Sequence, residues 1–145
     1  MQIDVPMAVS FTDCPGGNHA ARLYQHKPKT KQTKRGVETL LRLVFQLTGL
    51  STGSKLILAG RNFVASLKPG SDLRQFLDGW LGVDFVESHQ RGGKFDFDLL
   101  NDRAADVVVQ RIENEDYPEP YVWLVSAHPP GTLTTEKYQD QKEGI

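Results

Sequence analysis

The spacing of apolar residues over positions 37–47 limits what this chain can fold into more than any other feature of its sequence. Apolar side chains recur there three and four residues apart, at Val37, Leu40, Leu41, Val44 and Leu47, and Leu43 and Phe45 widen the stripe. This spacing predicts an amphipathic helix that buries one broad face. The apolar residues 55–59 then predict a short strand that is buried on both of its faces.

A run of basic residues, from His26 to Arg35, leads directly into the predicted helix. Positive charge beside a helix N-terminus opposes the helix dipole, and no capping residue immediately precedes Val37. A bound anion such as a phosphate would relieve both defects, because it would neutralise the lysines and accept from the free N–H groups. The run also fits an extended, hydrated loop, since Pro28 lies within it and Thr and Gln separate its charges. The sequence leaves both interpretations open.

The rest of the chain predicts one more helix and several strands. A helix is expected over 71–81, with Leu73, Phe76, Leu77, Trp80 and Leu81 on its buried face. Residues that alternate in character predict a hairpin over 83–99 with its turn at 89–93. Further strands are expected over 3–11, where Pro6 favours a sheet edge, and over 107–112 and 121–125, with the last two paired. Residues 63–67 should form a second short strand or a helical turn.

These elements predict an α+β fold in which two amphipathic helices pack on one mixed β-sheet. A three-layer α/β fold is the runner-up, because helices and strands alternate in the first half of the chain. A length of 145 residues suits one domain. We expect this domain to span residues 1–128 and to carry a basic loop at 25–36, and we expect residues 129–145 to form a C-terminal tail.

Charge is distributed unevenly along a chain whose net charge is only −1. Residues 1–70 hold ten Lys or Arg against three Asp or Glu, a balance of +7, whereas the remainder holds seven against fifteen, a balance of −8. Such asymmetry is typical of a protein with one nucleic-acid-binding face or of a subunit that packs head to tail. The sequence has one cysteine, and it has neither a signal-peptide pattern nor an apolar stretch close to the about 20 residues of a membrane span. These features favour a cytoplasmic protein.

Two groups of residues invite chemical hypotheses. Cys14 and His19 lie near Asp13 in a loop, which suggests a nucleophilic site, although a buried structural thiol explains the same residues. Asp96 and Asp98 would share one face of a strand and could bind Mg²⁺ if a third ligand converged on them. We expect no cofactor and no enzymatic activity, because neither group matches the spacing of a known catalytic or metal motif.

The function that the sequence favours is that of a nucleic-acid-associated accessory protein without enzymatic activity. Its phosphate contacts would be Lys27, Lys29, Lys31, Lys34, Arg35 and Arg42, with Arg91 and Lys94 as basic residues at the tip of the predicted hairpin. Sequence specificity should be weak and base stacking should contribute little, because Tyr24 is the aromatic residue nearest to the run. The alternatives are a structural or adaptor subunit that binds acidic protein surfaces or its own copies, and a small enzyme built on Cys14 and His19.

Overall fold

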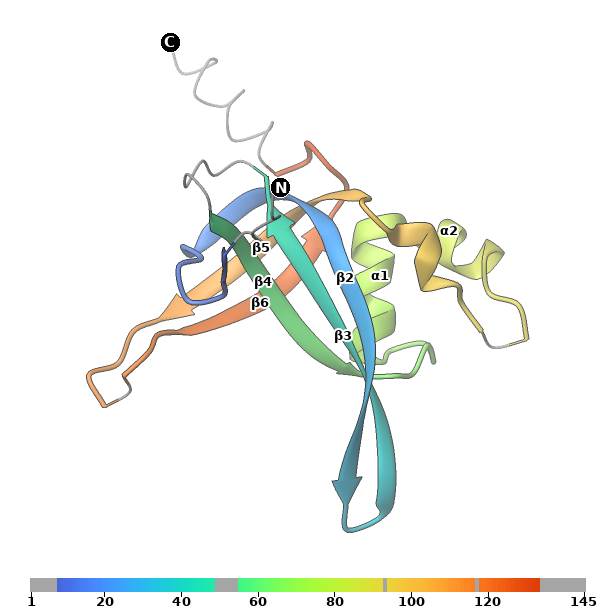
Figure 1. Ribbon diagram of the computed structural model, residues 1–145. Helices are drawn as coiled ribbons and strands as arrows, with labels where there is room; N and C mark the ends of the chain where they lie inside the picture. The colour runs from blue at the N-terminus through green and yellow to red at the C-terminus, as the bar shows by residue number, and fades with distance from the viewer. Residues whose placement is uncertain (1–7, 49–54, 93, 117, 134–145) are drawn as a thin grey trace, which may run out of the picture.

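The computed structural model describes residues 8–48, 55–92, 94–116 and 118–133 and shows one curved β-sheet with two α-helices, an α+β arrangement (Figure 1). The strands are β1 (Ala8–Ser10), β2 (Gly17–Thr33), β3 (Gly36–Leu47), β4 (Lys55–Val64), β5 (Ala104–Ile112) and β6 (Tyr121–His128). The helices are α1 (Asp72–Leu81) and α2 (Val83–Ser88), and a short 3-10 helix, η1, spans Phe97–Leu100. No helix in the described part of the chain is both long and apolar enough to cross a membrane.

The sheet has the strand order β1-β4-β3-β2-β5-β6. The strands β2 to β6 pair antiparallel, and only β1 joins in parallel, at the start of β4. Strands β2, β3 and β4 follow one another directly, and the chain then returns through α1 to place β5 beside β2, which is a Greek-key connection. The sheet curls so far that β4 and β6 come into contact (Figure 1). We call the line where β4 and β6 meet the seam.

The core lies inside this curl, and α1 closes it on one side. Leu41, Leu43, Phe45 and Leu47 alternate along β3 and are buried on the inner face of the sheet. The Phe45 ring packs against Phe76 and Trp80 of α1, with ring centroids 5.9 and 5.1 Å apart. One strand and one helix therefore supply much of the aromatic packing of the core.

The predicted helix over 71–81 is confirmed. The Ser71 hydroxyl accepts from the Arg74 backbone N–H at 3.3 Å as an N-cap, and Gly82 ends the helix with a φ of 90°. Leu73, Phe76, Leu77 and Trp80 are buried, whereas Leu81 is only partly buried. The pairing of the strands around 107–112 and 121–125 is also confirmed, as β5 and β6.

The prediction of a helix over 37–47 is wrong, because these residues form strand β3. The basic residues before it therefore do not precede a helix N-terminus, and the expected loop at 25–36 is mostly the second half of β2. Apolar residues fill so much of 37–47 that they satisfy a period of two as well as a period of 3.6. Pro28 is tolerated in β2 because β5 pairs with β2 only as far as Arg22 and leaves that edge free.

Two smaller predictions are also wrong. Strand β4 runs without a break through Gly60, so 63–67 is not a separate strand or helical turn. The hairpin predicted over 83–99 is replaced by α2 and η1, and of its turn only the bridge between Arg91 and Lys94 is present. The parallel strand β1 lies at a sheet edge, as predicted for 3–11. Pro6 and the tail residues 134–145 lie outside the described residues.

Candidate nucleic-acid interface

The β2–β3 hairpin extends beyond the rest of the sheet as a two-stranded ribbon (Figure 1). Strand β4 pairs with β3 from Leu40 onward, and the Ala65 backbone N–H donates to the Thr39 carbonyl at 3.0 Å. Past that bond the two strands pair only with each other in the described structure. We call residues 28–39 the arm. Its turn, Lys34 and Arg35, is closed by the Thr33 hydroxyl, which donates to the Gly36 carbonyl at 2.9 Å.

The arm carries its positive charges on one face and at its tip. Lys27, Lys29 and Lys31 alternate along β2, so their side chains share a face of the ribbon. Arg42 of β3 stands opposite Lys27, whereas Glu38 stands opposite Lys31. None of the five cations from Lys27 to Arg35 forms an ion pair within the described residues. Two like charges directly opposite one another repel, and an anion placed between them would remove that cost.

The face that carries Lys27 and Arg42 continues across the outer side of β4. Arg42 pairs in register with Asn62, and Val44 pairs with Gly60. A side chain at Gly60 would meet the Arg42 guanidinium at 3.4 Å, so glycine leaves the room in which that group lies. The Arg42 guanidinium also lies 5.0 Å from the centre of the Phe11 ring. Arg42 is therefore held across the surface of the sheet rather than extended into solvent.

Strand β6 brings two aromatic rings to the same surface. Tyr121 and Trp123 stack at 6.0 Å with an interplanar angle of 17°, and Tyr121 is 56% exposed. The rings lie beside β4, because the pocket of about 250 Å³ at this place is lined by residues of both strands. We call this pocket the basic-aromatic groove, and its lining residues are Arg42, Gly60, Arg61, Asn62, Tyr121, Val122 and Trp123. The groove combines guanidinium groups with flat apolar rings.

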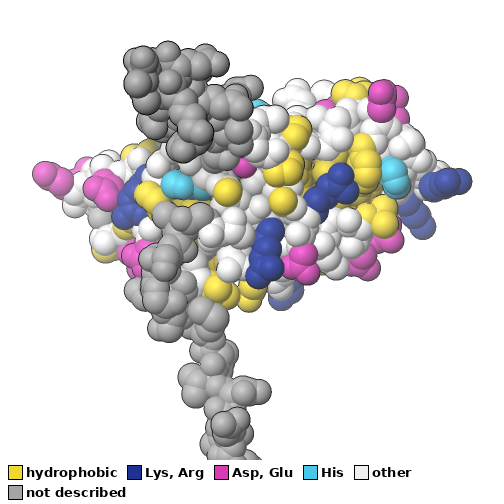
Figure 2. Space-filling model, turned by 90° about the horizontal axis from the view of Figure 1, so that it is seen from above, with side chains coloured by type: hydrophobic (Ala, Val, Ile, Leu, Met, Phe, Trp, Pro, Cys, Tyr) yellow, Lys and Arg dark blue, Asp and Glu magenta, His cyan; other side chains and the backbone are white. Residues whose placement is uncertain are grey.

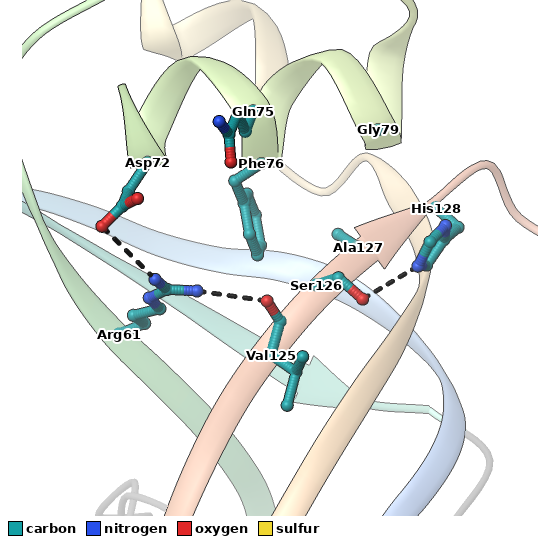
Figure 3. Close-up of a pocket in the computed structure, with 9 residues that line it drawn as sticks. All are labelled: Arg61, Asp72, Gln75, Phe76, Gly79, Val125, Ser126, Ala127 and His128. Atoms are coloured by element: carbon teal, nitrogen blue, oxygen red, sulfur yellow. Dashed lines mark hydrogen bonds and ion pairs between the residues drawn. The ribbon is translucent and has the colours of Figure 1, made fainter. Parts of the chain in front are cut away.

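Arg61 connects the groove to the seam. Its guanidinium lies 4.5 Å from the centre of the Trp123 ring and 4.6 Å from that of Phe63. The same side chain donates to the Leu124 carbonyl of β6 at 3.3 Å. It also donates to the Val125 carbonyl at 3.1 Å and lies 3.9 Å from the Asp72 carboxylate (Figure 3). Arg61 therefore ties β6 to β4 and fixes the edge on which Trp123 lies.

A second hollow lies on the α1 side of Arg61. It measures about 280 Å³ and is lined by residues of α1 and β6 together with Arg61 (Figure 3). Ser126 and His128 hydrogen-bond to each other at 2.9 Å on its β6 side. Gly79 of α1 approaches β6 closely, since a Cβ there would lie 3.2 Å from the Ala127 carbonyl oxygen. Helix α1 and strand β6 are therefore closely packed beside this hollow.

Acidic side chains mark the far end of the groove. The loop between β5 and β6 carries four exposed acids, Glu113, Glu115, Asp116 and Glu119, directly before Tyr121. Figure 2 shows acidic side chains gathered at the left end of the molecule, where this hairpin projects in Figure 1. A phosphate chain lying in the groove would be repelled at this end and drawn toward the arm at the other.

The structure brings together most of the predicted phosphate contacts, but not all of them. Lys27, Lys29, Lys31 and Arg42 share a face, and Lys34 and Arg35 form the tip of the ribbon. Arg91 and Lys94 belong to a separate turn between α2 and η1, where each backbone N–H donates to the other residue's carbonyl. Lys94 lies near the base of the arm but lines a different pocket, with Pro28 and Leu41.

Sequence reasoning missed the residues that complete the groove, which are Arg61, Tyr121 and Trp123. The basic run itself contains no aromatic residue, but in the structure Trp123 contacts Arg61 and Tyr121 lines the groove with Arg42. The signal in the sequence is the alternation of Tyr121 and Trp123, which puts both rings on one face of a strand.

The two chemical hypotheses receive no support from the geometry. The Cys14 thiol and the His19 ring each lie against the Pro15 carbonyl, at 3.7 and 2.8 Å, and no hydrogen bond between the described atoms joins them. Burial raises the pKa of the Cys14 thiol to about 11, against a smaller opposing effect of Arg111. A thiol with such a pKa stays protonated and is a poor nucleophile near neutral pH.

Asp96 and Asp98 do not lie on a strand, so the expected shared strand face is wrong. The Asp96 carboxylate caps η1 by accepting from the Asp98 backbone N–H at 3.0 Å, and the Asp98 carboxylate lies 3.0 Å from the His26 ring. Among the described residues, no group of three or more His, Cys, Asp or Glu is placed to hold a metal ion.

Five antiparallel strands in a Greek-key order, with cations and aromatic rings that line one pocket, define the class as a small β-rich protein with a candidate ligand groove. Comparison of the sequence with protein-family models and with curated proteins finds no match.

Proposed function

We propose that this protein binds single-stranded nucleic acid in the basic-aromatic groove, with weak sequence specificity and without enzymatic activity. The observation that carries the proposal is that Arg42 and Arg61 line one pocket with Tyr121 and Trp123. The Arg42 guanidinium can contact a phosphate, Arg61 holds Trp123 in place, and flat rings stack on unpaired bases of any kind. Lys27, which stands opposite Arg42 at the base of the arm, adds a phosphate contact next to the groove.

The architecture supports the same proposal. A five-stranded, partly open Greek-key barrel is the architecture of the OB-fold, and the order of β2 to β6 with its seam between β4 and β6 matches it. OB-folds bind oligonucleotides or oligosaccharides on the face of their second and third strands and on two loops. Here those strands are β3 and β4, and the loops are the arm and the acidic β5–β6 loop. A fold alone does not assign a function, so the groove residues carry the argument.

The test is a titration of labelled single-stranded DNA and RNA with the protein, followed by fluorescence anisotropy. Trp123→Ala should weaken binding by about 5- to 150-fold, because stacking of one base on an aromatic ring is worth about 1–3 kcal/mol. Trp123→Phe keeps a flat apolar ring and should restore most of the affinity. Equal affinity of Trp123→Ala and the unchanged protein would rule out the groove as the binding site.

A charge variant tests the phosphate contacts separately. Arg42→Gln removes a groove cation and should weaken the binding of all single strands by a similar factor, since phosphate contacts do not read sequence. The control is the pair Arg91→Gln and Lys94→Gln, which removes charge from the turn between α2 and η1 and should leave affinity nearly unchanged. If the control weakens binding more than Arg42→Gln does, the site lies on the α2 side instead.

The main alternative is a structural or adaptor subunit, and one observation favours it. The acidic β5–β6 loop and the basic arm project from different parts of the molecule (Figure 1), so the arm of one copy could bind the loop of another. Light scattering at low salt without nucleic acid separates the two proposals. Assemblies that dissolve on addition of salt, together with no binding of nucleic acid, would favour the adaptor.

A further inference from the structure

We infer that the arm engages double-stranded nucleic acid while the groove holds a single strand, so that the preferred ligand is a junction between the two. This inference rests on the proposed function and assigns a separate ligand to the arm. It begins from the difference in chemistry between the two surfaces. Residues 27–42 contain no Phe, Tyr or Trp, whereas the groove has Tyr121 and Trp123.

A surface without aromatic rings suits a duplex better than a single strand. Bases that leave a stack need a new flat partner, and the arm offers none. The bases of a duplex are already stacked on one another, so a duplex presents mainly its phosphates, which the alternating Lys27, Lys29 and Lys31 can neutralise. The groove has the opposite preference, because its rings need unpaired bases to stack on.

The shape of the arm agrees with this assignment. Beyond the last pair of β3 with β4, four residues of each strand, 30–33 and 36–39, form a two-stranded ribbon about 13 Å long at about 3.3 Å per residue. A two-stranded β-ribbon is narrow enough to enter the major groove of a duplex, which is about 12 Å wide. The arm also twists away from the sheet at its base, so its tip points away from the barrel (Figure 1).

The two surfaces meet at one point. Lys27 at the base of the arm stands opposite Arg42, and Arg42 lines the groove. A phosphate at this point would separate two like charges and would be shared by the strand in the groove and the duplex along the arm. The acidic β5–β6 loop repels phosphates at the other end of the groove, so the single strand would have the duplex on its arm side.

The experiment compares three labelled DNA probes at one salt concentration. They are a single strand of about 12 nucleotides, which is within the about 4–16 nucleotides that one OB-fold covers, a duplex of about 12 base pairs, and a junction that joins the two. We expect the junction to bind about tenfold more tightly than the single strand of equal sequence. Equal affinity for junction and single strand would overturn the inference.

Two matched variants show which surface is responsible. The pair Lys29→Gln and Lys31→Gln should lower junction affinity about tenfold toward that of the single strand and change single-strand affinity less than about threefold. Arg91→Gln removes a charge from the turn between α2 and η1 and should change neither. Weakening of single strand and junction by equal factors in the arm variant would overturn the inference.

The same titrations separate this inference from the proposed function. If the unchanged protein binds no probe, the proposed function fails and the inference fails with it. If it binds the single strand but gains nothing from the junction, only the inference fails and the groove stands. Circular dichroism of both variants checks that they are folded, and their charge changes lie on exposed side chains.

Discussion

At the scale of single residues, Arg61 shows why a cation in a candidate binding site need not be a ligand contact. Its guanidinium already donates hydrogen bonds to two backbone carbonyls of β6 and lies over two aromatic rings, and its side chain is only 16% exposed. Its neighbour in the groove, Arg42, makes no ion pair within the described residues. We therefore assign phosphate contact to Arg42 and the positioning of Trp123 to Arg61.

Cys14 gives a prediction at the same scale. Burial raises the pKa of its thiol to about 11, so the native protein should react with iodoacetamide at pH 8 at least about tenfold more slowly than the urea-unfolded chain. The reaction is followed by mass spectrometry of the intact protein. A native rate equal to the unfolded rate would contradict this prediction and would revive the hypothesis of a reactive thiol.

The raised pKa of Cys14 also has a consequence for stability. A thiol whose pKa is higher in the folded state keeps its contribution to stability at any pH below the unfolded pKa, near 9, and loses it as pH rises toward about 11. The urea concentration at the unfolding midpoint should therefore decrease as the pH is raised from about 8 to about 10.5. Cys14→Ala serves as the control, because its urea midpoint should fall less over the same interval.

At the scale of elements, α1 could be predicted because every local signal agreed. Ser71 caps it, Gly82 ends it and its apolar residues fit only a period of 3.6. Strand β3 could not, because the dense apolar residues between Val37 and Leu47 fit both periods. The decisive fact is the pairing of β3 with β2 and β4, which is set by residues distant in the sequence.

The sequence alone predicts the cations of the candidate site but not its aromatic residues. Composition identifies the cations from Lys27 to Arg35, since a cluster of lysines is visible without any structure. Composition does not reveal Trp123, because its place beside Arg61 depends on how far the sheet curls to bring β6 to β4. A long-range contact of this kind has no local signal, so the aromatic half of the groove required the fold.

The arm gives a prediction at the scale of one element. On the tip side of Thr39, the strands of the arm pair only with each other in the described structure. Removing residues 31–38 and joining the ends with Asn-Gly should therefore lower the free energy of unfolding by less than about 1 kcal/mol. Phe45→Ala, in the core of the same strand, should cost about 3–5 kcal/mol. Urea denaturation measures both changes.

The shortened arm also separates stability from binding. It lacks Lys31, Lys34 and Arg35 but keeps the groove intact, so its single-strand affinity should stay close to that of the full chain while its junction affinity falls. A large loss of stability in the shortened protein would show that the arm is part of the folded core, and the arm would then no longer be an independent element.

At the scale of the whole molecule, the distribution of charge predicts how binding depends on salt. Each neutralised phosphate contributes about −0.7 to the slope of log K against log salt for a single strand and about −0.9 for a duplex. Lys27 and Arg42 border the groove, which gives a slope of about −1.4 for the single strand.

A junction should have a steeper salt dependence than a single strand, because it adds the arm. Lys29, Lys31, Lys34 and Arg35 would contact duplex phosphates, which brings the slope to about −5. Anisotropy titrations between about 50 and 200 mM salt measure both slopes. Equal slopes for the two probes would mean that the arm and the groove serve the same strand. A junction slope that stays near −5 after Lys29→Gln and Lys31→Gln would mean that the duplex is bound away from the arm.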